Sequence, residues 1–304
     1  MPGEPAPQQA TSAPSRRPAL DADRAWDRLL SVRTPRDAEA AGLAPGADGE
    51  WRWTQAATPG ATRLARRYLP LCLAGPHCVF AQLGQSVDGF IATRTGDANY
   101  ITGEEDRRHL HRLRALADAV VVGAGTVVAD DPRLTVRACA GRSPARVVVD
   151  RGGRVPPDRG VFTDGAAPTL WIRGAGRAAA RPGGDGVATL EVPGDDEGFA
   201  PRRLLDTLAG RGLGRVLVEG GGVTVSRFLA AGVLDRLHVT VAPVILGEGV
   251  PGLRFPGPDR MGGALRAPVR RFTLGEDTLL EFDLRTGRER ADLPQQQHTG
   301  AGQA

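Results

Sequence analysis

One segment of the sequence, residues 119–137, combines a buried strand, a glycine turn and a dense group of polar side chains. It reads AVVVGAGTVVADDPRLTVR, so the apolar run Val120 to Val122 stops at Gly123. A short apolar run bounded by glycine is typical of an interior strand of a parallel sheet. Open parallel sheets bind ligands at the carboxyl ends of their strands, where glycine permits close approach of the backbone. The segment therefore predicts an α/β fold with a binding site at this strand end.

A plain strand-to-helix turn is the simpler interpretation of the same glycines. The third glycine of the dinucleotide-binding pattern G-x-G-x-x-G is replaced by Val128. Asp130 and Asp131 stand before a proline, a combination that commonly forms turns. Arg137 adds a planar cation suited to phosphate. It is the combination of these features, more than any one of them, that favours binding.

A second glycine turn follows the predicted strand 216–219. Gly220, Gly221 and Gly222 are consecutive, and a helical pattern begins at Thr224. Backbone amides at a helix N-terminus attract phosphate groups, and a turn without Cβ atoms lets a ligand approach closely. This turn is therefore a second candidate binding element.

The remaining pattern is an alternation of strands and helices between residues 79 and 285. Thr102 and Glu105 match the spacing of a capping box at a helix N-terminus. Residues 1–20 and 286–304 lack periodicity and are predicted to be disordered tails, and residues 21–78 form an extension without a chemical motif. Strands are expected at 79–83, 90–92, 120–122, 146–150, 169–172, 187–192, 216–219, 234–242 and 278–284, and helices at 21–32, 35–41, 102–117, 201–209 and 224–231.

Composition excludes several classes of protein. The formal net charge is +4 and the arginines are spread along the chain, so nucleic acid is not an expected partner. No apolar run reaches the roughly 18 residues of a membrane span, and the first residues lack the apolar core of a secretory signal. The three cysteines and five histidines show no metal-ligand spacing. A cytoplasmic enzyme without a metal is expected, and no residue is assigned as an acid or base.

Three segments together resemble the riboflavin-pathway pyrimidine reductases, the reductase half of the bifunctional pyrimidine deaminase-reductases. The segments are QLGQSVDGFIAT, DANYITGEEDRRHLHRLRALADAVVVGAGTVVADDPRLTVR and VLVEGGGVTVSRFLAAGVLDRLHVTVAPVILG. The resemblance covers residues 79–285. It implies a dihydrofolate-reductase-like fold, with three α/β/α layers around a mixed, mostly parallel sheet, in a protein that is usually a homodimer.

The resemblance also implies a reaction and its cofactor. NADPH would deliver a hydride to C1′ of the ribosyl group of 5-amino-6-(5-phosphoribosylamino)uracil and open it to the ribitylamino product. The cofactor carries the redox chemistry, so a chain without a catalytic triad or metal is compatible with this reaction.

Site residues follow from the resemblance position by position. The implied contacts with the phosphorylated substrate are Gln82, Ala98, Arg114, Leu134, Arg137 and Glu219. The implied contacts with NADPH are Gly84, Tyr100, Thr126, Asp130, Arg151, Gly221, Gly222, Val223 and Thr224, with Arg154 as a neighbouring candidate for the 2′-phosphate.

Three departures from the family pattern keep other hypotheses open. Gln82 replaces a lysine and Ala98 replaces a serine, and the zinc signature of the deaminase half is missing, so deamination is expected on a separate chain. A second hypothesis keeps the fold and cofactor but assigns a pterin, or a modified pyrimidine or purine, as substrate. A third is a non-catalytic nucleotide-binding partner.

Overall fold

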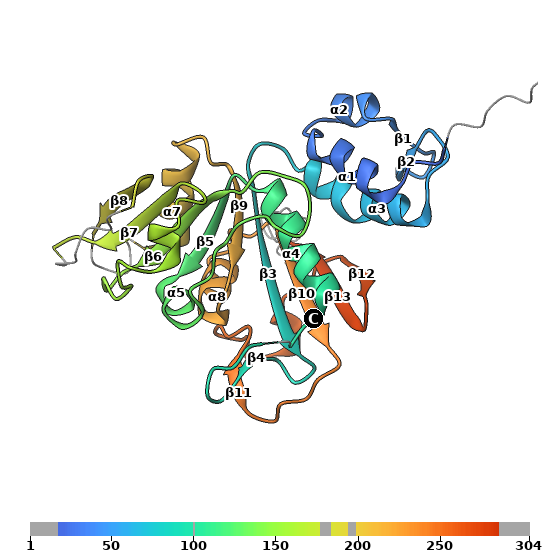
Figure 1. Ribbon diagram of the computed structural model, residues 1–304. Coiled ribbons are helices and arrows are strands. Elements are labelled where there is room, and N and C mark those ends of the chain that lie inside the picture. The colour runs from blue at the N-terminus through green and yellow to red at the C-terminus, as the bar shows by residue number, and fades with distance from the viewer. Residues whose placement is uncertain (1–17, 100, 177–183, 194–198, 286–304) are drawn as a thin grey trace, which may run out of the picture. The chain divides into compact units, whose positions relative to one another are not determined.

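The computed structural model describes residues 18–99, 101–176, 184–193 and 199–285, which form two compact units (Figure 1). The first unit ends at Leu73 and the second begins at Ala74. We predicted this boundary a few residues later, after residue 78. None of the helices in the described ranges is long and apolar enough to cross a membrane.

The first unit packs three helices with a small hairpin. Trp26 meets Tyr68 edge to face, with 5.2 Å between ring centroids. The elements are α1 (Ala22–Leu30), α2 (Pro35–Ala40), β1 (Leu43–Pro45), β2 (Trp51–Trp53) and α3 (Pro59–Cys72). The prediction of a disordered tail over residues 1–20 is wrong at Leu20, which is buried and forms a β-bridge with Ala57. Residues 1–17 and 286–304 lie outside the described residues.

The longest helix of this unit, α3, was not predicted. Its start carries a clear signal, because the Thr58 side chain accepts a hydrogen bond from the Ala61 amide and Pro59 occupies the first turn. Pro70 lies inside the helix, however, and proline normally argues against a helix interior. Burial of Leu64, Tyr68 and Leu71 stabilises the helix in spite of it.

The second unit is built on one sheet of nine described strands, in the order β12-β13-β10-β3-β9-β5-β6-β7-β8. The strands from β10 to β8 pair in parallel, and β13 and β12 are antiparallel, which confirms a mixed, mostly parallel sheet. The bounds are β3 (Cys78–Ser86), β5 (Ala119–Gly123), β6 (Ala145–Asp150), β7 (Thr169–Gly174), β8 (Val187–Val192), β9 (Arg215–Glu219), β10 (Arg236–Ala242), β12 (Val269–Leu274) and β13 (Asp277–Asp283).

Helices cover both faces of this sheet, as the three-layer prediction requires. One face packs Ala81 and Val218 against α7 (Pro201–Ala209) and α8 (Gly222–Ala230). The other face carries α4 (Glu104–Leu116) and the short α6 (Gly160–Thr163), whose Phe162 packs on Trp171. The chain also forms α5 (Ala124–Asp130), a small ribbon of β4 (Phe90–Thr93) with β11 (Gly249–Pro251), and a 3-10 turn at Met261–Gly263.

The capping box predicted for α4 is wrong. The N-cap is Gly103, whose amide donates to the Asp277 carboxylate at 2.7 Å. The Thr102 hydroxyl instead bonds the side chain of Asp106, in the first turn of the helix. Strand β12 was also not predicted, because its alternation of apolar and charged residues is weak. Its extended conformation is stabilised by antiparallel pairing with β13.

Candidate active site

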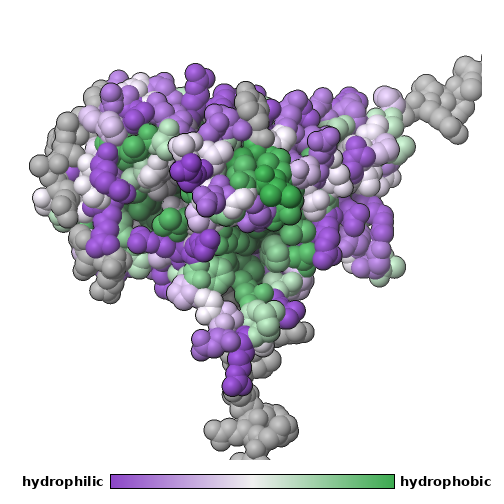
Figure 2. All heavy atoms as spheres, turned by 90° about the horizontal axis from the view of Figure 1, so that it is seen from below, coloured by the Kyte–Doolittle hydropathy of each residue, from purple (hydrophilic) through white to green (hydrophobic). Residues whose placement is uncertain are grey.

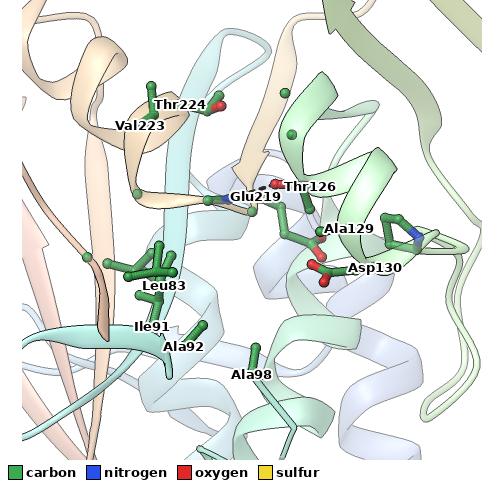
Figure 3. Close-up of a pocket in the computed structure, with 18 of the residues that line it drawn as sticks. Leu83, Ile91, Ala92, Ala98, Thr126, Ala129, Asp130, Glu219, Val223 and Thr224 are labelled. Atoms are coloured by element: carbon green, nitrogen blue, oxygen red, sulfur yellow. Dashed lines mark hydrogen bonds between the residues drawn. The ribbon is translucent and has the colours of Figure 1, made fainter. Parts of the chain in front are cut away.

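A cavity of about 970 Å³ lies where β3, β5, β6 and β9 end. It is lined by the glycine turns after β5 and β9 and by the ribbon of β4 and β11. Figure 2 shows a hollow on the face seen from below, with apolar surface inside it and hydrophilic side chains around. In Figure 3, Val223 and Thr224 lie at the start of α8 on one side of the cavity, and Leu83, Ile91 and Ala98 lie on the other side.

The two predicted glycine turns meet at this cavity. Thr126, on α5, accepts a hydrogen bond from the Gly221 amide at 3.0 Å (Figure 3). A Cβ on Gly220, whose φ is +110°, would stand 2.9 Å from the Thr126 hydroxyl. A Cβ on Gly222 would stand 1.8 Å from the Gly252 carbonyl oxygen. The glycines are therefore required for the close packing of the α8 N-terminus against its neighbours.

A row of polar side chains crosses the sheet beneath α4. Gln82 on β3 is in register with Glu219 on β9 and with His238 on β10, and His238 is in register with Glu281 on β13. Register partners point to the same face of a sheet, so these four side chains all face α4. His109, on α4, lies 3.3 Å from His238 between ring nitrogens.

Glu219 is held in a buried ion pair at the cavity wall. Arg114 on α4 donates from Nε to one carboxylate oxygen at 2.8 Å and from a second nitrogen to the other oxygen. Both residues are less than a tenth exposed. Arg114 also donates to the Thr135 carbonyl at 3.0 Å, so the pair fixes both the end of β9 and the loop after α5.

Asp106 forms a second polar group on the same wall. Its carboxylate accepts from the Thr240 hydroxyl at 2.6 Å and faces the Gln82 amide nitrogen at 3.3 and 3.4 Å. Burial raises the pKa of Asp106, and the charge of Asp277 adds to the rise, while hydrogen bonds from Thr240, Thr102 and Gln82 oppose it. The residue is only 3% exposed and yet lines the cavity.

Arginines supply positive charge to the cavity from several elements. Arg151 and Arg154 follow β6, where the Asp150 carboxylate accepts from the Arg154 and Val155 amides at 2.9 Å and fixes the turn. Three more arginines line the cavity: Arg107, Arg227 and Arg254. Partial shielding from water raises the pKa of Asp130, an acid on the same wall.

Most of the predicted site residues line this cavity together. They are Gln82, Gly84, Ala98, Thr126, Asp130, Arg151, Glu219, Gly221, Gly222, Val223 and Thr224. Of the described candidates, Arg114, Leu134 and Arg137 do not line it: Arg114 lies behind Glu219, and Leu134 is buried with a φ of +56°. Tyr100 lies outside the described residues.

Asp106 was not predicted as a site residue. Three acids in the first turn of a helix are ordinarily explained by the helix dipole, so the sequence did not single it out. The arginines Arg227 and Arg254 were missed for a similar reason, because exposed helix and loop arginines carry no pattern that separates a ligand contact from a solvated charge. Among the described residues, no group of three or more His, Cys, Asp or Glu side chains could hold a metal ion.

His111 links α4 to the loop after α5 and gives a prediction about pH. Its Nδ1 accepts from the Arg137 amide at 3.0 Å, and burial with the charges of Arg114 and Arg137 lowers its pKa from 6.5 to about 4. Between these values the unfolded chain takes up a proton that the folded chain does not. We therefore expect this group to reduce the free energy of unfolding as the pH falls from 6.5 towards 4, with no effect above that window.

Urea unfolding across this pH range measures the effect. The variant His111→Gln keeps an acceptor for the Arg137 amide but cannot be protonated, so its decline in stability should be shallower than that of the wild type. His77→Gln, at an exposed position, is the matched control and should follow the wild type. Parallel curves for wild type and His111→Gln would contradict the assignment.

Comparison with known proteins gives a consistent set of relatives. Residues 77–278 match the RibD C-terminal domain family. The chain is 38% identical over 218 residues to the 2,5-diamino-6-ribosylamino-4(3H)-pyrimidinone 5′-phosphate reductase of Methanothermobacter thermautotrophicus, a match that covers 68% of this chain and 98% of that protein. It is 37% identical to the riboflavin biosynthesis protein RibD of Bacillus amyloliquefaciens, with 62% and 51% coverage. The chain thus spans about half of the latter.

Solved structures show the same fold. The deaminase/5-amino-6-(5-phosphoribosylamino)uracil reductase of Thermotoga maritima superposes with a TM-score of 0.58 at 27% identity. The match covers 73% of this chain and 60% of that chain.

Proposed function

The chain belongs to the RibD C-terminal domain family, and we propose that it reduces the ribosyl group of a 6-ribosylaminopyrimidine 5′-phosphate with NADPH in riboflavin biosynthesis. The observation that carries this proposal is a single cavity of about 970 Å³ with two different halves. One half is a glycine-rich helix N-terminus with arginines, suited to a dinucleotide. The other is a wall of hydrogen-bonding side chains, suited to a polar ring.

The residues present fit a bound NADPH. The N-terminus of α8 opens into the cavity through Gly222 and Val223, and first-turn amides of a helix lack partners within the helix. Arg151 and Arg154 stand at the end of the neighbouring strand β6, within the same cavity. When bound, the nicotinamide would supply the hydride that C1′ of the ribosyl group receives.

The remaining chemistry is binding, orientation and exclusion of water. C1′ gains a hydride, its bond to the ring oxygen breaks, and that oxygen gains a proton, which yields the ribityl chain. Gln82, Asp106 and Glu219 would bond the pyrimidine ring and fix C1′ relative to the cofactor half. Apolar side chains such as Leu83, Ile91 and Phe228 would exclude water from the reacting carbon.

We further propose a homodimer and a separate deaminase chain. Several large apolar side chains of the second unit are strongly exposed, including Ile245 at 77%, Met261 at 75% and Leu265 at 59%. Contiguous exposed apolar surface marks protein interfaces, and a dimer that covered these side chains would remove them from water. Sedimentation of the purified protein measures the mass of the assembly, and a monomer at all concentrations would contradict the dimer.

The preference between cofactors tests the phosphate-binding half. Charge-assisted hydrogen bonds to the 2′-phosphate from Arg151 and Arg154 should contribute about 1.5–3 kcal/mol, so NADPH should bind roughly tenfold to a hundredfold more tightly than NADH. Fluorescence titration of both cofactors measures the ratio. The double variant with both arginines changed to alanine should bring the ratio close to one, whereas Arg211→Ala, at an exposed position after α7, should preserve it. Equal wild-type affinities would refute the assignment.

Substrate-dependent oxidation of NADPH tests the function as a whole. The purified protein is mixed with NADPH and, in separate reactions, with a 6-ribosylaminopyrimidine 5′-phosphate or a dihydropterin. Turnover of the ribosylaminopyrimidine supports the proposal, and turnover of the pterin alone would replace it. Tight NADPH binding without turnover of either compound would favour a nucleotide-binding partner without catalytic activity.

A further inference from the structure

The loop that leaves the cavity wall after α5, residues 131–137, contains strained backbone. Pro132 lines the cavity, and the two non-glycine residues with positive φ in the described ranges both lie in this loop: Asp131 at +40° and Leu134 at +56°. Left-handed backbone is unfavourable for a leucine and persists only where the surrounding structure holds it. Burial of the Leu134 side chain is one such restraint.

Helix α4 supplies two further restraints on this loop. The Arg114 guanidinium donates to the Thr135 carbonyl at 3.0 Å, and the Arg137 amide donates to Nδ1 of His111 at 3.0 Å. Residues three apart lie next to each other on a helix surface, so His111 and Arg114 hold the loop from one face of α4. Arg114 also pairs with Glu219 on the cavity wall. The loop is therefore tied, through α4, to the site.

His111 can accept this hydrogen bond because its ring is neutral. Burial, together with the charges of Arg114 and Arg137, lowers the pKa of His111 to about 4. The charge of Glu219 and the Thr135 carbonyl oppose this shift. A neutral imidazole offers one nitrogen as an acceptor, and a protonated imidazole offers none. At neutral pH, Nδ1 is therefore a constant acceptor for the Arg137 amide.

The loop also carries two exposed arginines, Arg133 and Arg137. Burial lowers the pKa of Arg137, and the cations Arg114 and Arg133 lower it further. The anion that opposes them, Glu219, is already paired with Arg114, so positive charge is in excess beside this part of the cavity wall. Guanidinium groups bind phosphate through paired N–H donors. The 5′-phosphate of the proposed substrate would supply the missing negative charge.

We propose that His111 is a positioning residue for the substrate phosphate: its Nδ1 fixes the backbone at Arg137, so that the two loop arginines meet the phosphate in one defined place. The inference rests on the proposed function and adds to it a residue that does not touch the substrate. The Arg137 side chain is restrained in the same loop, because it donates to the Thr135 hydroxyl at 2.7 Å. A phosphate fixed at one end of the ribosyl group orients C1′ at the other.

The test measures kcat and KM with a 6-ribosylaminopyrimidine 5′-phosphate and with the same compound without its phosphate, at about pH 8, where imidazole is neutral. The ratio of the two values of kcat/KM is the phosphate preference. His111→Leu removes the acceptor, so KM for the phosphorylated compound should rise about tenfold or more, and the phosphate preference should fall by a similar factor. His111→Gln keeps an acceptor for the Arg137 amide and should retain the wild-type preference.

Two further variants separate positioning from a general disturbance. Leu113→Ala removes a buried side chain from the same helix and should lower stability without changing the phosphate preference. Arg137→Ala changes an exposed side chain and should lower the preference at least as far as His111→Leu does. Combining Arg137→Ala with His111→Leu should add little, because both act on the same contact. Urea unfolding and NADPH affinity establish that each variant is folded and binds the cofactor.

The outcomes are distinct. A phosphate preference that falls in His111→Leu and is retained in His111→Gln supports the inference. Equal effects of His111→Leu on both compounds, an equally low preference in His111→Gln, or a wild-type preference in Arg137→Ala would overturn it and leave the reductase function intact. The result for Arg137→Ala decides the matter even if His111→Leu does not fold. No turnover of either compound by a folded wild type that binds NADPH would overturn the proposed function itself.

Discussion

Replacement of Gly222 by alanine is expected to raise the Kd for NADPH at least tenfold and to lower the free energy of unfolding by about 1–3 kcal/mol. The new Cβ would stand 1.8 Å from the Gly252 carbonyl oxygen and 2.6 Å from that of Pro251, both of them backbone atoms. Relief of this overlap must separate the α8 N-terminus from the strand ribbon that lines the cavity. Titration with NADPH and urea unfolding measure the two effects.

The expected loss of stability in Gly222→Ala is opposite in sign to the usual effect of replacing glycine by alanine in a helix. Alanine ordinarily stabilises a helix relative to glycine, by about 1 kcal/mol. Gly262→Ala is the matched control, because a Cβ there meets nothing within 4 Å and its φ is not positive. If Gly222→Ala were as stable as this control and bound NADPH like the wild type, the packing described at the α8 N-terminus would be wrong.

Glu219→Gln is expected to lower the free energy of unfolding by about 3–5 kcal/mol, because it leaves the buried guanidinium of Arg114 without its counter-ion. We also expect kcat/KM to fall by more than tenfold, since the carboxylate orients both the cavity wall and, through Arg114, the loop at Thr135. Chemical denaturation and steady-state kinetics measure the two losses.

Two variants show whether the loss comes from the unpaired charge. Glu104→Gln makes the same substitution in an exposed ion pair with Arg108 and should cost less than about 1 kcal/mol. The double variant Arg114→Met with Glu219→Leu removes both charges and should recover much of the stability without recovering activity. A Glu219→Gln variant as stable as Glu104→Gln would contradict the account of the buried pair.

The parts of the fold and site that the sequence predicts are those encoded in short segments. The strands that end at Gly123 and Glu219 carry apolar runs followed directly by glycine, and parallel pairing brings such ends to one edge of a sheet. That geometry is general, so the meeting of the two glycine turns at one cavity follows from local signals alone. The α/β class follows in the same way from the alternation of strands and helices, whereas the three-layer arrangement with a mixed sheet was implied by the resemblance to the pyrimidine reductases.

The parts that the sequence does not predict depend on partners far along the chain. In the sequence, Asp106 looks like an ordinary acid in the first turn of a helix. Its role in the cavity wall depends on hydrogen bonds from Thr240, 134 positions later, and from Gln82. The pairing of Arg114 with Glu219 spans 105 positions and was not predicted, although each residue was a candidate. Helix α3 was missed because Pro70 opposes it locally, while burial of Tyr68 and Leu71 within the first unit supports it.

The reaction that we propose is the transfer of a hydride from NADPH to C1′ of a ribosylaminopyrimidine phosphate. The most direct measurement uses NADPH deuterated at C4 of the nicotinamide on the transferred face and analyses the pyrimidine product by mass spectrometry and NMR. We expect a ribitylamino product with one deuterium, located at C1′, and no deuterium in the product when the label is on the opposite face of the nicotinamide. Oxidation of the cofactor without deuterium in the product, or deuterium in the pyrimidine ring, would contradict the claim.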